Sequence, residues 1–269
     1  MTMSKSMPAT EHKPTIVVKL GGSMLDQLTD SFYASFKELQ EHYHCIIVHG
    51  GGPAITRLLD KLKIEGEFYN GLRRTTEQTL EVVEMVLGGT VSSQITGALT
   101  KQGIPAIGVK GSEASLLQAT YMDRENLDFV GKVERVDPTI LQQLLAYGYV
   151  PVVAPFGKTA DQQTVNINGD VAAGAIAQAV GAEKLLFVTD VPGILVEDHV
   201  LGHTTPDDIG VMIEEGTIYG GMIPKVQSAV DALSDHLQEV LIVSGERPLI
   251  EGSTLTGTSI KAKRKEKVE

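Results

Sequence analysis

Residues 15–23 read TIVVKLGGS and residues 45–53 read CIIVHGGGP, and these two stretches decide the fold. In each, an almost wholly apolar run rich in β-branched residues leads into consecutive glycines, and a helical segment follows. Near-continuous apolar runs are typical of parallel strands that are covered on both faces. Each stretch therefore predicts a buried strand, a tight glycine turn and a helix, which is the repeating unit of α/β proteins.

The same alternation continues along the chain. Helical periodicity predicts two amphipathic helices. The apolar face of the first consists of Phe32, Phe36, Leu39 and Tyr43, and that of the second consists of Ile223, Val226, Val230, Leu233 and Leu237. Four further strand candidates are IPAIGV (104–109), YVPVVAP (149–155), KLLFVTD (184–190) and EVLIVSG (239–245). Short alternating runs with turn residues predict β-hairpins at 66–73 and 118–136. We expect a three-layer α/β sandwich with one continuous, mainly parallel sheet and two lobes that meet near residues 155–166.

Composition limits the function. No apolar run approaches the roughly 18 residues that span a bilayer, and the N-terminus lacks the apolar core of a signal peptide. Cys45 is the single cysteine, which excludes a disulfide and a thiolate metal cluster. The net charge of −11 disfavours general binding of nucleic acid. We expect a cytoplasmic protein that holds any anionic ligand with a local cluster of donors.

The glycine turns are candidates for binding phosphate. Glycine lets the backbone approach a ligand closely, and a helix N-terminus carries free N–H groups that favour anions. A single glycine pair is most simply a turn, but two such loops, the first preceded by Lys19, favour a phosphate site. The chain has no G-x-x-x-x-G-K-[ST], which excludes a P-loop enzyme. The first strand is not followed by G-x-G-x-x-G, which disfavours a dinucleotide dehydrogenase.

Five polar residues could carry chemistry, and each has a simpler alternative. Lys19 ends a strand, so it contacts phosphate or is a solvated strand end. Lys225 lies in a first helical turn, where a nearby anion would offset the unfavourable helix dipole, or it is a tolerated surface lysine. Arg73 follows a turn and could grip a carboxylate through two hydrogen bonds, or lie on the surface. Asp170 could simply complement a helix dipole, and Asn166 could be an ordinary loop residue.

Nine segments, in order from about residue 15 to residue 260, resemble the amino-acid kinase family. They are VKLGGS (18–23), IIVHGGGP (46–53), NGLR (70–73), EMVLGG (84–89), PVVAPFG (151–157), VNINGD (165–170), TDVPGIL (189–195), GGMIPKV (220–226) and GTSI (257–260). NGLR together with GGMIPK resembles the branch that phosphorylates N-acetyl-L-glutamate, rather than the carbamate, aspartate, uridylate or glutamate 5-kinases. The resemblance implies a carbamate kinase-like fold and ATP-dependent phosphorylation of a side-chain carboxylate, a step of arginine biosynthesis.

The resemblance also implies roles for the charged residues. Lys19 and Lys225 would neutralise the phosphoryl group in transfer, and Asp170 would hold both lysines in position. Arg73 and Asn166 would bind the α-carboxylate of the substrate.

The remaining implied contacts are to nucleotide and to the attacking group. Gly21 and Gly22 would contact the ATP phosphates, whereas Gly51 and Gly52 would donate N–H groups near the attacking carboxylate. The nucleoside pocket of the C-terminal lobe would be lined by Asp190, Gly193 and Met222. No residue is assigned as a metal ligand, because Mg²⁺ would be held mainly by the ATP phosphates.

The chain departs from the family pattern at several positions. Arg74 and Thr76 stand where valine and aspartate are usual, and Gly169 replaces an alanine. Residues 244–253 are shorter than the usual final loop and lack its histidine. These departures affect the detail of the pockets and leave the reaction class unchanged.

The implied chemistry is consistent with the residue inventory. A carboxylate nucleophile with an unperturbed pKa of about 4.3 is ionised at neutral pH, so the reaction requires no general base. Alignment and charge neutralisation remain, and these tasks suit lysines and glycine N–H groups. Two alternatives stay open. One is an acetylaminoadipate kinase of lysine biosynthesis, whose substrate is one methylene longer. The other is a non-catalytic amino-acid or nucleotide sensor on the same fold.

Domain limits and assembly complete the expectations. We expect an N-terminal tail (1–14), a kinase domain (15–260) and a basic tail (261–269). Within the kinase domain, a lobe for acetylglutamate and dimerisation (15–155) precedes a lobe for ATP (156–260). Family members inhibited by arginine carry an extra N-terminal helix, for which the 14 residues before Thr15 are too few. We therefore expect a homodimer without arginine feedback, formed through a helical segment at 77–101 that could equally be a core helix.

Overall fold

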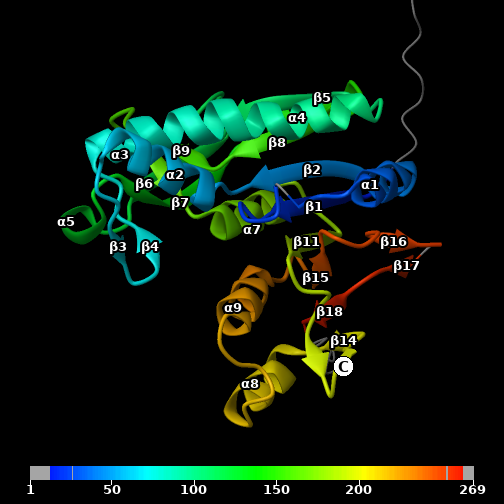
Figure 1. Cartoon of the computed structure of the whole chain (residues 1–269). Helices are drawn as coiled ribbons and strands as arrows, with labels where there is room; N and C mark the ends of the chain where they lie inside the picture. Colours follow the sequence, from blue (N-terminus) through cyan, green and yellow to red (C-terminus); the bar gives the residue numbers. More distant parts are fainter. Residues whose placement is uncertain (1–12, 26, 253, 263–269) are drawn as a thin grey trace, which may run out of the picture.

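The computed structural model describes residues 13–25, 27–252 and 254–262. Its main feature is an eight-stranded sheet, shown in Figure 1. The strands in spatial order are β14 (His203–Thr204), β18 (Thr258–Lys261), β15 (Glu239–Ser244), β11 (Lys184–Thr189), β1 (Thr15–Leu20), β2 (His44–His49), β8 (Val150–Ala154) and β5 (Ala106–Lys110). The six apolar runs identified in the sequence form the six neighbouring strands from β15 to β5.

Those six strands pair in parallel. Lys19 of β1, for example, lies between Phe187 of β11 and Val48 of β2. β18 is antiparallel to β15, and β14 pairs with the other side of β18 and forms the edge of the sheet. The α/β class and the mainly parallel sheet are therefore confirmed.

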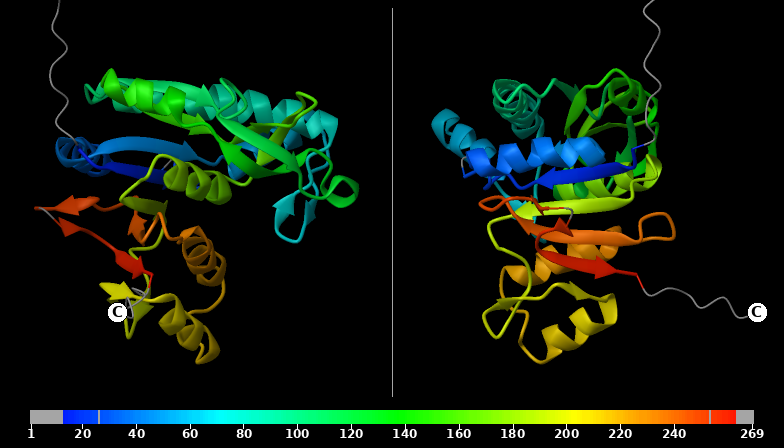
Figure 2. Two further views of the ribbon diagram at one scale, coloured as in Figure 1. Left: turned by 180° about the vertical axis from the view of Figure 1, so that it is seen from behind. Right: turned by 90° about the vertical axis from the view of Figure 1, so that its right-hand side faces the viewer.

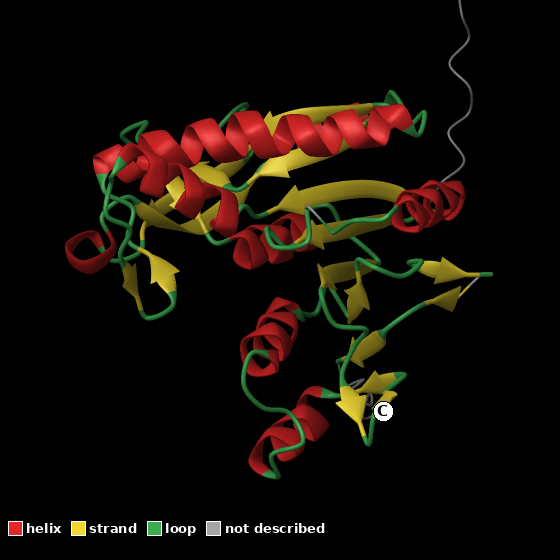
Figure 3. Cartoon of the chain, viewed as in Figure 1, coloured by secondary structure: helices red, strands yellow, loops and turns green. Residues whose placement is uncertain are grey.

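Helices cover both faces of this sheet, giving three layers, and Figure 1 shows α4 and α7 on opposite sides of β1 and β2. One face carries α1 (Asp30–His42), α2 (Gly52–Leu62), α3 (Glu77–Val83), the π-helix η1 (Glu84–Val91) and α4 (Ser92–Lys101). The other carries α6 (Thr139–Ala146), α7 (Gly169–Ala179), α8 (Pro206–Glu214) and α9 (Met222–Ala232). Figure 3 shows the same layers by secondary structure.

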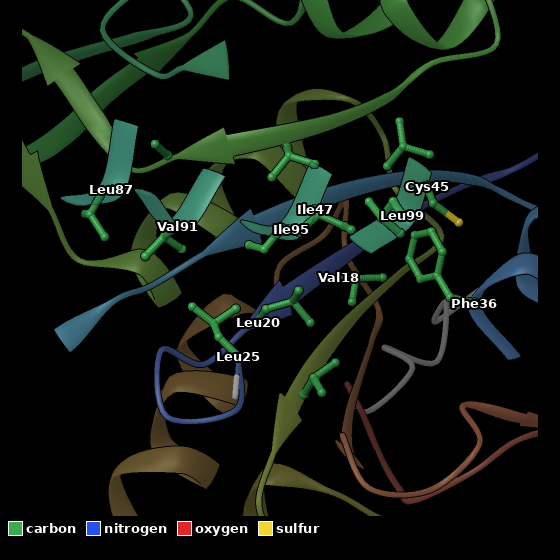
Figure 4. Packing of buried hydrophobic residues seen from close by; sticks show 14 of the residues in the cluster. Val18, Leu20, Leu25, Phe36, Cys45, Ile47, Leu87, Val91, Ile95 and Leu99 are labelled. Carbon is green, nitrogen blue, oxygen red and sulfur yellow. The ribbon is translucent and has the colours of Figure 1, made fainter. Parts of the chain in front are cut away.

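The strand side chains alternate between two apolar clusters, one under each layer of helices. Val18 and Ile47 face α1 and the α3–η1–α4 run, whereas Val17 and Ile46 face α7 and α9. Figure 4 shows Leu87, Val91, Ile95 and Leu99 in a row along this run, with Ile95 and Leu99 nearest to Ile47. The apolar face of segment 77–101 is thus buried in the chain's own core, including Leu80, Val83, Leu87 and Val91.

The main sheet is continuous, as expected, and holds all six predicted strands, but the sequence did not predict that a second sheet closes beside it. β6 (Leu117–Tyr121), β7 (Val130–Val136), β9 (Phe156–Lys158) and β10 (Thr164–Ile167) close into a separate four-stranded barrel, with α5 (Arg124–Leu127) between β6 and β7. The predicted hairpin at 118–136 is the antiparallel β6–β7 pair of this barrel. Two glycines allow the four strands to close into so narrow a barrel, because a side chain at either position would clash with a neighbouring strand. A Cβ on Gly131 would lie 2.4 Å from Val165 Cγ2, and a Cβ on Gly157 would lie 2.7 Å from Ala119 Cβ.

The second predicted hairpin is confirmed. β3 (Phe68–Tyr69) and β4 (Leu72–Arg73) pair antiparallel, and Asn70 and Gly71 make the turn with φ of 48° and 78°. Two positive φ angles are characteristic of a tight type I′ hairpin turn. Figure 2 shows this hairpin, coloured cyan, projecting from the body of the molecule. Two further small hairpins are β12 (Leu195–Val196) with β13 (His199–Val200) and β16 (Ile250–Glu251) with β17 (Thr254–Leu255).

No helix in the described ranges has the length and apolar character needed to cross a membrane. Most of the expected tails, 1–14 and 261–269, lies outside the described residues. The division of the kinase domain at residue 155 stays a prediction, although β8 of the main sheet ends at Ala154 and β9 of the barrel begins at Phe156.

Candidate active site

The two glycine loops lie side by side because the strands before them are neighbours. Leu20 ends β1 opposite His49, which ends β2. The first loop is fixed by Gly21 N–H, which donates to Val188 O at 3.3 Å. The second is fixed by Gly50 N–H, which donates to Leu20 O at 2.9 Å. Parallel strands thus bring both loops to the carboxyl edge of the sheet, as the sequence predicts.

The loops touch at Gly22, and the contact requires glycine there. A Cβ on Gly22 would lie 2.6 Å from Gly51 N and 2.8 Å from Gly52 N, which is too close for any side chain. Gly51 is the N-cap of α2 and Gly52 is its first residue. N–H groups at such positions have no partner within the helix and favour an anion. A glycine at position 22 therefore keeps two anion-binding groups uncovered.

Both lysines line the same cavity, Lys19 from β1 and Lys225 from α9. A cavity of about 490 Å³ is lined by Lys19, Lys225, Asp170 and the two glycine loops. Lys19 Nζ lies 2.7 Å from Asp170 Oδ1. The Lys225 ammonium donates to the Asp190 carboxylate and so lowers the pKa of that carboxyl, with a further hydrogen bond from the Thr189 hydroxyl. Two cations and a set of backbone N–H groups thus surround one space, which is suited to a polyphosphate.

The carboxylates are distributed differently from the family expectation. Asp170 was expected to hold both lysines, but in this structure it pairs with Lys19 while Asp190 pairs with Lys225. Asp190 was expected to line the nucleoside pocket. Asn168 is the N-cap of α7, and its Oδ1 accepts from the backbone N–H of Asp170 at 2.8 Å. This cap fixes the backbone of Asp170 in the first turn of the helix. The sequence signal for this cap was an asparagine directly before a predicted helix.

A second cavity of about 540 Å³ is lined by Arg73 and Asn166, the two residues expected to bind the α-carboxylate of the substrate. Its wall includes Gly51 and Gly52, which also line the first cavity, so the two spaces share an edge. The Arg73 guanidinium lies 4.6 Å from the centre of the Phe68 ring.

Arg73 is held in place by neutral groups. Its Nη2 donates to Thr56 Oγ1 at 2.7 Å and to Gly52 O at 3.3 Å. Burial lowers the pKa of Arg73, and the charge of Asp60 opposes that shift. A partly buried cation whose hydrogen bonds go to uncharged oxygens is well suited to receive an anionic ligand.

His49 lies directly before the second glycine loop but lines neither cavity, and the sequence alone did not single it out. Its side chain is fully buried, and Nδ1 lies 3.0 Å from Gly50 O, to which it donates. Nε2 is buried and has no partner within the described residues. Burial lowers the pKa of His49 to about 4, so the ring is neutral at physiological pH. The available signal was a histidine directly before three glycines.

The three residues expected to contact the nucleoside, Asp190, Gly193 and Met222, line neither cavity. Gly193 has φ of 145° and packs against Thr258, whose Oγ1 would lie 2.6 Å from a Cβ. Met222 begins α9 and packs against the apolar cluster beneath α7 and α9. Their contact with nucleotide stays a prediction. In the part of the chain that is described, no three His, Cys, Asp or Glu side chains are grouped to hold a metal ion.

Comparison with known proteins agrees with this fold and site. Residues 14–244 match the amino acid kinase family, and the chain belongs to that family. Its relatives include the acetylglutamate kinase of Geobacillus thermodenitrificans, 47% identical over 92% of this chain and 96% of that protein. The acetylglutamate kinase of Bacillus subtilis is 46% identical over 95% of this chain and 99% of that protein.

Solved structures share the fold. The smu.665 protein of Streptococcus mutans superposes with a TM-score of 0.80 at 31% identity, covering 92% of this chain and 98% of that one. Carbamate kinase from Giardia lamblia superposes with a TM-score of 0.65 at 14% identity, covering 93% of this chain and 99% of that one. The second likeness confirms the expected carbamate kinase-like architecture and nothing more specific.

Proposed function

We propose that this kinase uses ATP to phosphorylate the side-chain carboxylate of N-acetyl-L-glutamate, giving N-acetyl-L-glutamyl 5-phosphate in arginine biosynthesis. The observation that carries the proposal is the shared edge of the two cavities. Gly51 and Gly52 lie between a space lined by Lys19 and Lys225 and a space lined by Arg73 and Asn166. The relatives that cover nearly the whole chain are acetylglutamate kinases, which agrees with this arrangement.

The geometry suggests how the substrate is held. Arg73 and Asn166 bind the α-carboxylate, which does not react, and so orient the side-chain carboxylate towards Gly51 and Gly52. Because that carboxylate is already ionised near neutral pH, it attacks without a general base. The buried ring of His49 donates to Gly50 O and lines neither cavity, so we assign it no role in proton transfer.

Charge neutralisation falls to the lysines. Two anions must approach each other, and negative charge is spread over the transferring phosphoryl group in the transition state. Lys19 and Lys225 approach the first cavity from β1 and α9, with Asp170 and Asp190 holding their side chains extended. Gly21, Gly22 and the amides of the second loop supply further positive potential. Preorganised cations and N–H groups lower the barrier because they need no rearrangement during the reaction.

We propose that Mg²⁺ enters with ATP and is held mainly by the phosphates, where it supplies further positive charge. Mg²⁺ retains several waters and needs only one or two carboxylates from a protein. Asp170 and Asp190, the carboxylates nearest the first cavity, are engaged by lysines. Asp190, Gly193 and Met222 are proposed to contact the nucleoside.

The test is ATP consumption in the presence of Mg²⁺, with and without acetylglutamate, and with acetylaminoadipate as the competing substrate. We expect consumption that depends on acetylglutamate and a kcat/KM roughly 10–200-fold lower for acetylaminoadipate, since one methylene is worth about 1–3 kcal/mol in a pocket. Hydroxylamine, which traps acyl phosphates, identifies the product. Binding of acetylglutamate without turnover would indicate a sensor, and preference for acetylaminoadipate would assign the chain to the longer substrate.

We also propose that the enzyme is a homodimer. The α3–η1–α4 run presents an exposed methionine, Met85, with the exposed Gly89 four residues further on, on a helix whose other face is buried in the core. Small residues beside an exposed apolar side chain permit the close approach of a second helix. No nucleic acid or membrane partner is proposed.

A further inference from the structure

Thr75 has no role in the sequence-based expectations. It connects Arg73 and Asn166, the two residues proposed to bind the α-carboxylate of the substrate. It follows β4 and is fully buried. Its N–H donates to Leu127 O at 3.1 Å, and its carbonyl accepts from Phe129 N at 2.9 Å. The carbonyl of Phe129 in turn accepts from Asn166 N at 2.8 Å. The backbone of Thr75 is thus joined, through one strand-like segment, to the strand that carries Asn166.

The side chain of Thr75 makes a second connection. Its Oγ1 donates to Arg73 O at 3.0 Å. The same Oγ1 lies 3.1 Å from Asn166 Nδ2. One hydroxyl group thus contacts the backbone of Arg73 and the side chain of Asn166, which line the second cavity together.

The hydroxyl proton decides which way the Asn166 amide faces. A threonine hydroxyl has one hydrogen to donate and otherwise only accepts. Because that hydrogen is used on Arg73 O, Oγ1 can only accept from Asn166, and the amide must turn its NH₂ group towards Thr75. An amide NH₂ has two hydrogens, so one remains for a ligand in the cavity. The opposite orientation would place two acceptors, Oγ1 and Oδ1, against each other.

We propose that Thr75 is a positioning residue that fixes the Asn166 amide as a hydrogen-bond donor, and so makes the second cavity selective for a carboxylate. A carboxylate only accepts hydrogen bonds, so both groups that face it must donate. Arg73 can only donate, whereas Asn166 donates or accepts according to its orientation. Thr75 removes that freedom. This inference rests on the proposed function, in which Arg73 and Asn166 bind the α-carboxylate of acetylglutamate.

The first test compares Thr75→Val, which keeps the shape and removes the hydroxyl, with Thr75→Ser, which keeps the hydroxyl. Thr75→Val should raise KM for acetylglutamate roughly tenfold, the effect of one misdirected hydrogen bond, and leave kcat and KM for ATP nearly unchanged. Thr75→Ser should restore a near wild-type KM. Thr120→Val is the matched control, because Thr120 is in a barrel strand and its buried Oγ1 has no partner among the described residues. It should move neither KM.

A purely structural role for Thr75 predicts different results. It would lower the melting temperature and the yield of active enzyme, with equal effects on both substrates and no selective rise in KM. If Thr75→Val does not fold, Thr75→Ala, which leaves room for a water, takes its place. A Thr75→Val or Thr75→Ala variant that folds and binds acetylglutamate as the wild type does would overturn the inference.

A double-mutant cycle identifies the route of the effect. If Thr75 acts through the Asn166 amide, Thr75→Val should add less than about twofold to KM when Asn166 is already alanine. Fully additive effects would mean that Thr75 acts elsewhere and would overturn the inference. The proposed function and the role of Thr75 can fail separately. A wild-type enzyme inactive with acetylglutamate overturns both, whereas an active wild type with an unaffected Thr75→Val variant overturns the role of Thr75 alone.

Discussion

Lys19 and Lys225 are anchored by separate carboxylates, which makes their contributions separable by mutation. The side chain of Lys225 is 35% exposed and that of its partner Asp190 is 54% exposed. An ion pair this accessible adds only about 0–1 kcal/mol to stability, so removing it should not unfold the protein. If the lysines act in the transition state, Lys19→Ala and Lys225→Ala should each lower kcat by at least roughly 10²-fold. Steady-state kinetics with a melting curve for each variant provide the measurement.

Lys110 offers a control for that experiment. It also ends a sheet strand and pairs with an acidic residue, Glu113, at 3.3 Å, but it lines neither of the two cavities described above. Lys110→Ala should leave kcat near the wild-type value. A Lys19 or Lys225 variant that resembled the Lys110 variant would remove that lysine from the mechanism.

His49 should make stability depend on pH. Its pKa is about 4 in the folded protein and about 6.5 when unfolded, so between these values the unfolded chain binds a proton that the folded chain does not. The free energy of unfolding should therefore fall as pH is lowered through this window, by up to about 1.4 kcal/mol per pH unit. Asp190, whose pKa is lowered in the folded protein, also makes the protein less stable in acid, because its ion pair is lost when the carboxylate is protonated. The measurement is therefore a difference, between wild type and His49→Asn, from denaturant titrations at pH 4.5 to 7.5. Parallel slopes for the two proteins would contradict the assignment.

At the scale of residues, the sequence predicts the location of a side chain where the pairing of neighbouring strands is enough to place it. Lys19 and the glycine loops could be placed because neighbouring parallel strands end at one edge. The partners could not be placed, because they come from distant segments. Thr75 and Asn166 are 91 residues apart, and Lys225 and Asp190 are 35 apart. No local pattern records such pairings, which depend on how the barrel and the second lobe dock against the sheet.

At the scale of elements, the contact between the two glycine loops is the feature most sensitive to a single methyl group. Gly22→Ala places Cβ against the backbone of Gly51 and Gly52, so the loops must separate. Overpacking of this kind costs about 1–3 kcal/mol. The variant should also lose activity, since its methyl group lies over the N–H groups of the second loop. In Gly21→Ala the nearest atom is Val188 O at 3.5 Å, an ordinary contact, so its loss of stability should be clearly smaller. Equal unfolding free energies for the two variants, from denaturant titration, would disprove the tight contact.

The elements themselves differ in how well the sequence specifies them. The six central strands were predictable because both faces are buried, which gives apolar runs without interruption. β14 and β18 were missed because they are short, lie at the edge and include polar residues. The sequence does not distinguish the barrel strands from the strands of the main sheet, because both kinds are short runs of β-forming residues bounded by turns. Its closure depends on Gly131 and Gly157 lying under side chains from other strands, which becomes visible only in three dimensions.

At the scale of the whole molecule, the assembly remains to be tested. The residues first considered for a dimer contact, Leu80, Val83, Leu87 and Val91, are buried within the chain and cannot meet a partner. The contact should instead use the opposite face of the α3–η1–α4 run, where Met85 is 54% exposed. The expectation that arginine does not inhibit is separate and is checked by assaying activity with and without arginine.

Met85→Glu should convert the predicted dimer into a monomer. In a two-fold interface the same side chain occurs twice, so each substitution would bury two unpaired carboxylates. Burying a charge without a partner is costly, and the dimer should weaken at least roughly a hundredfold. Met122→Glu is the matched control, because Met122 is 51% exposed but directly follows β6 of the barrel and is no part of the α3–η1–α4 run. Light scattering over a range of protein concentrations measures the effect. The proposed interface requires a dimeric wild type, a dimeric Met122 variant and a dissociating Met85 variant, and a monomeric wild type or a dimeric Met85 variant would exclude it.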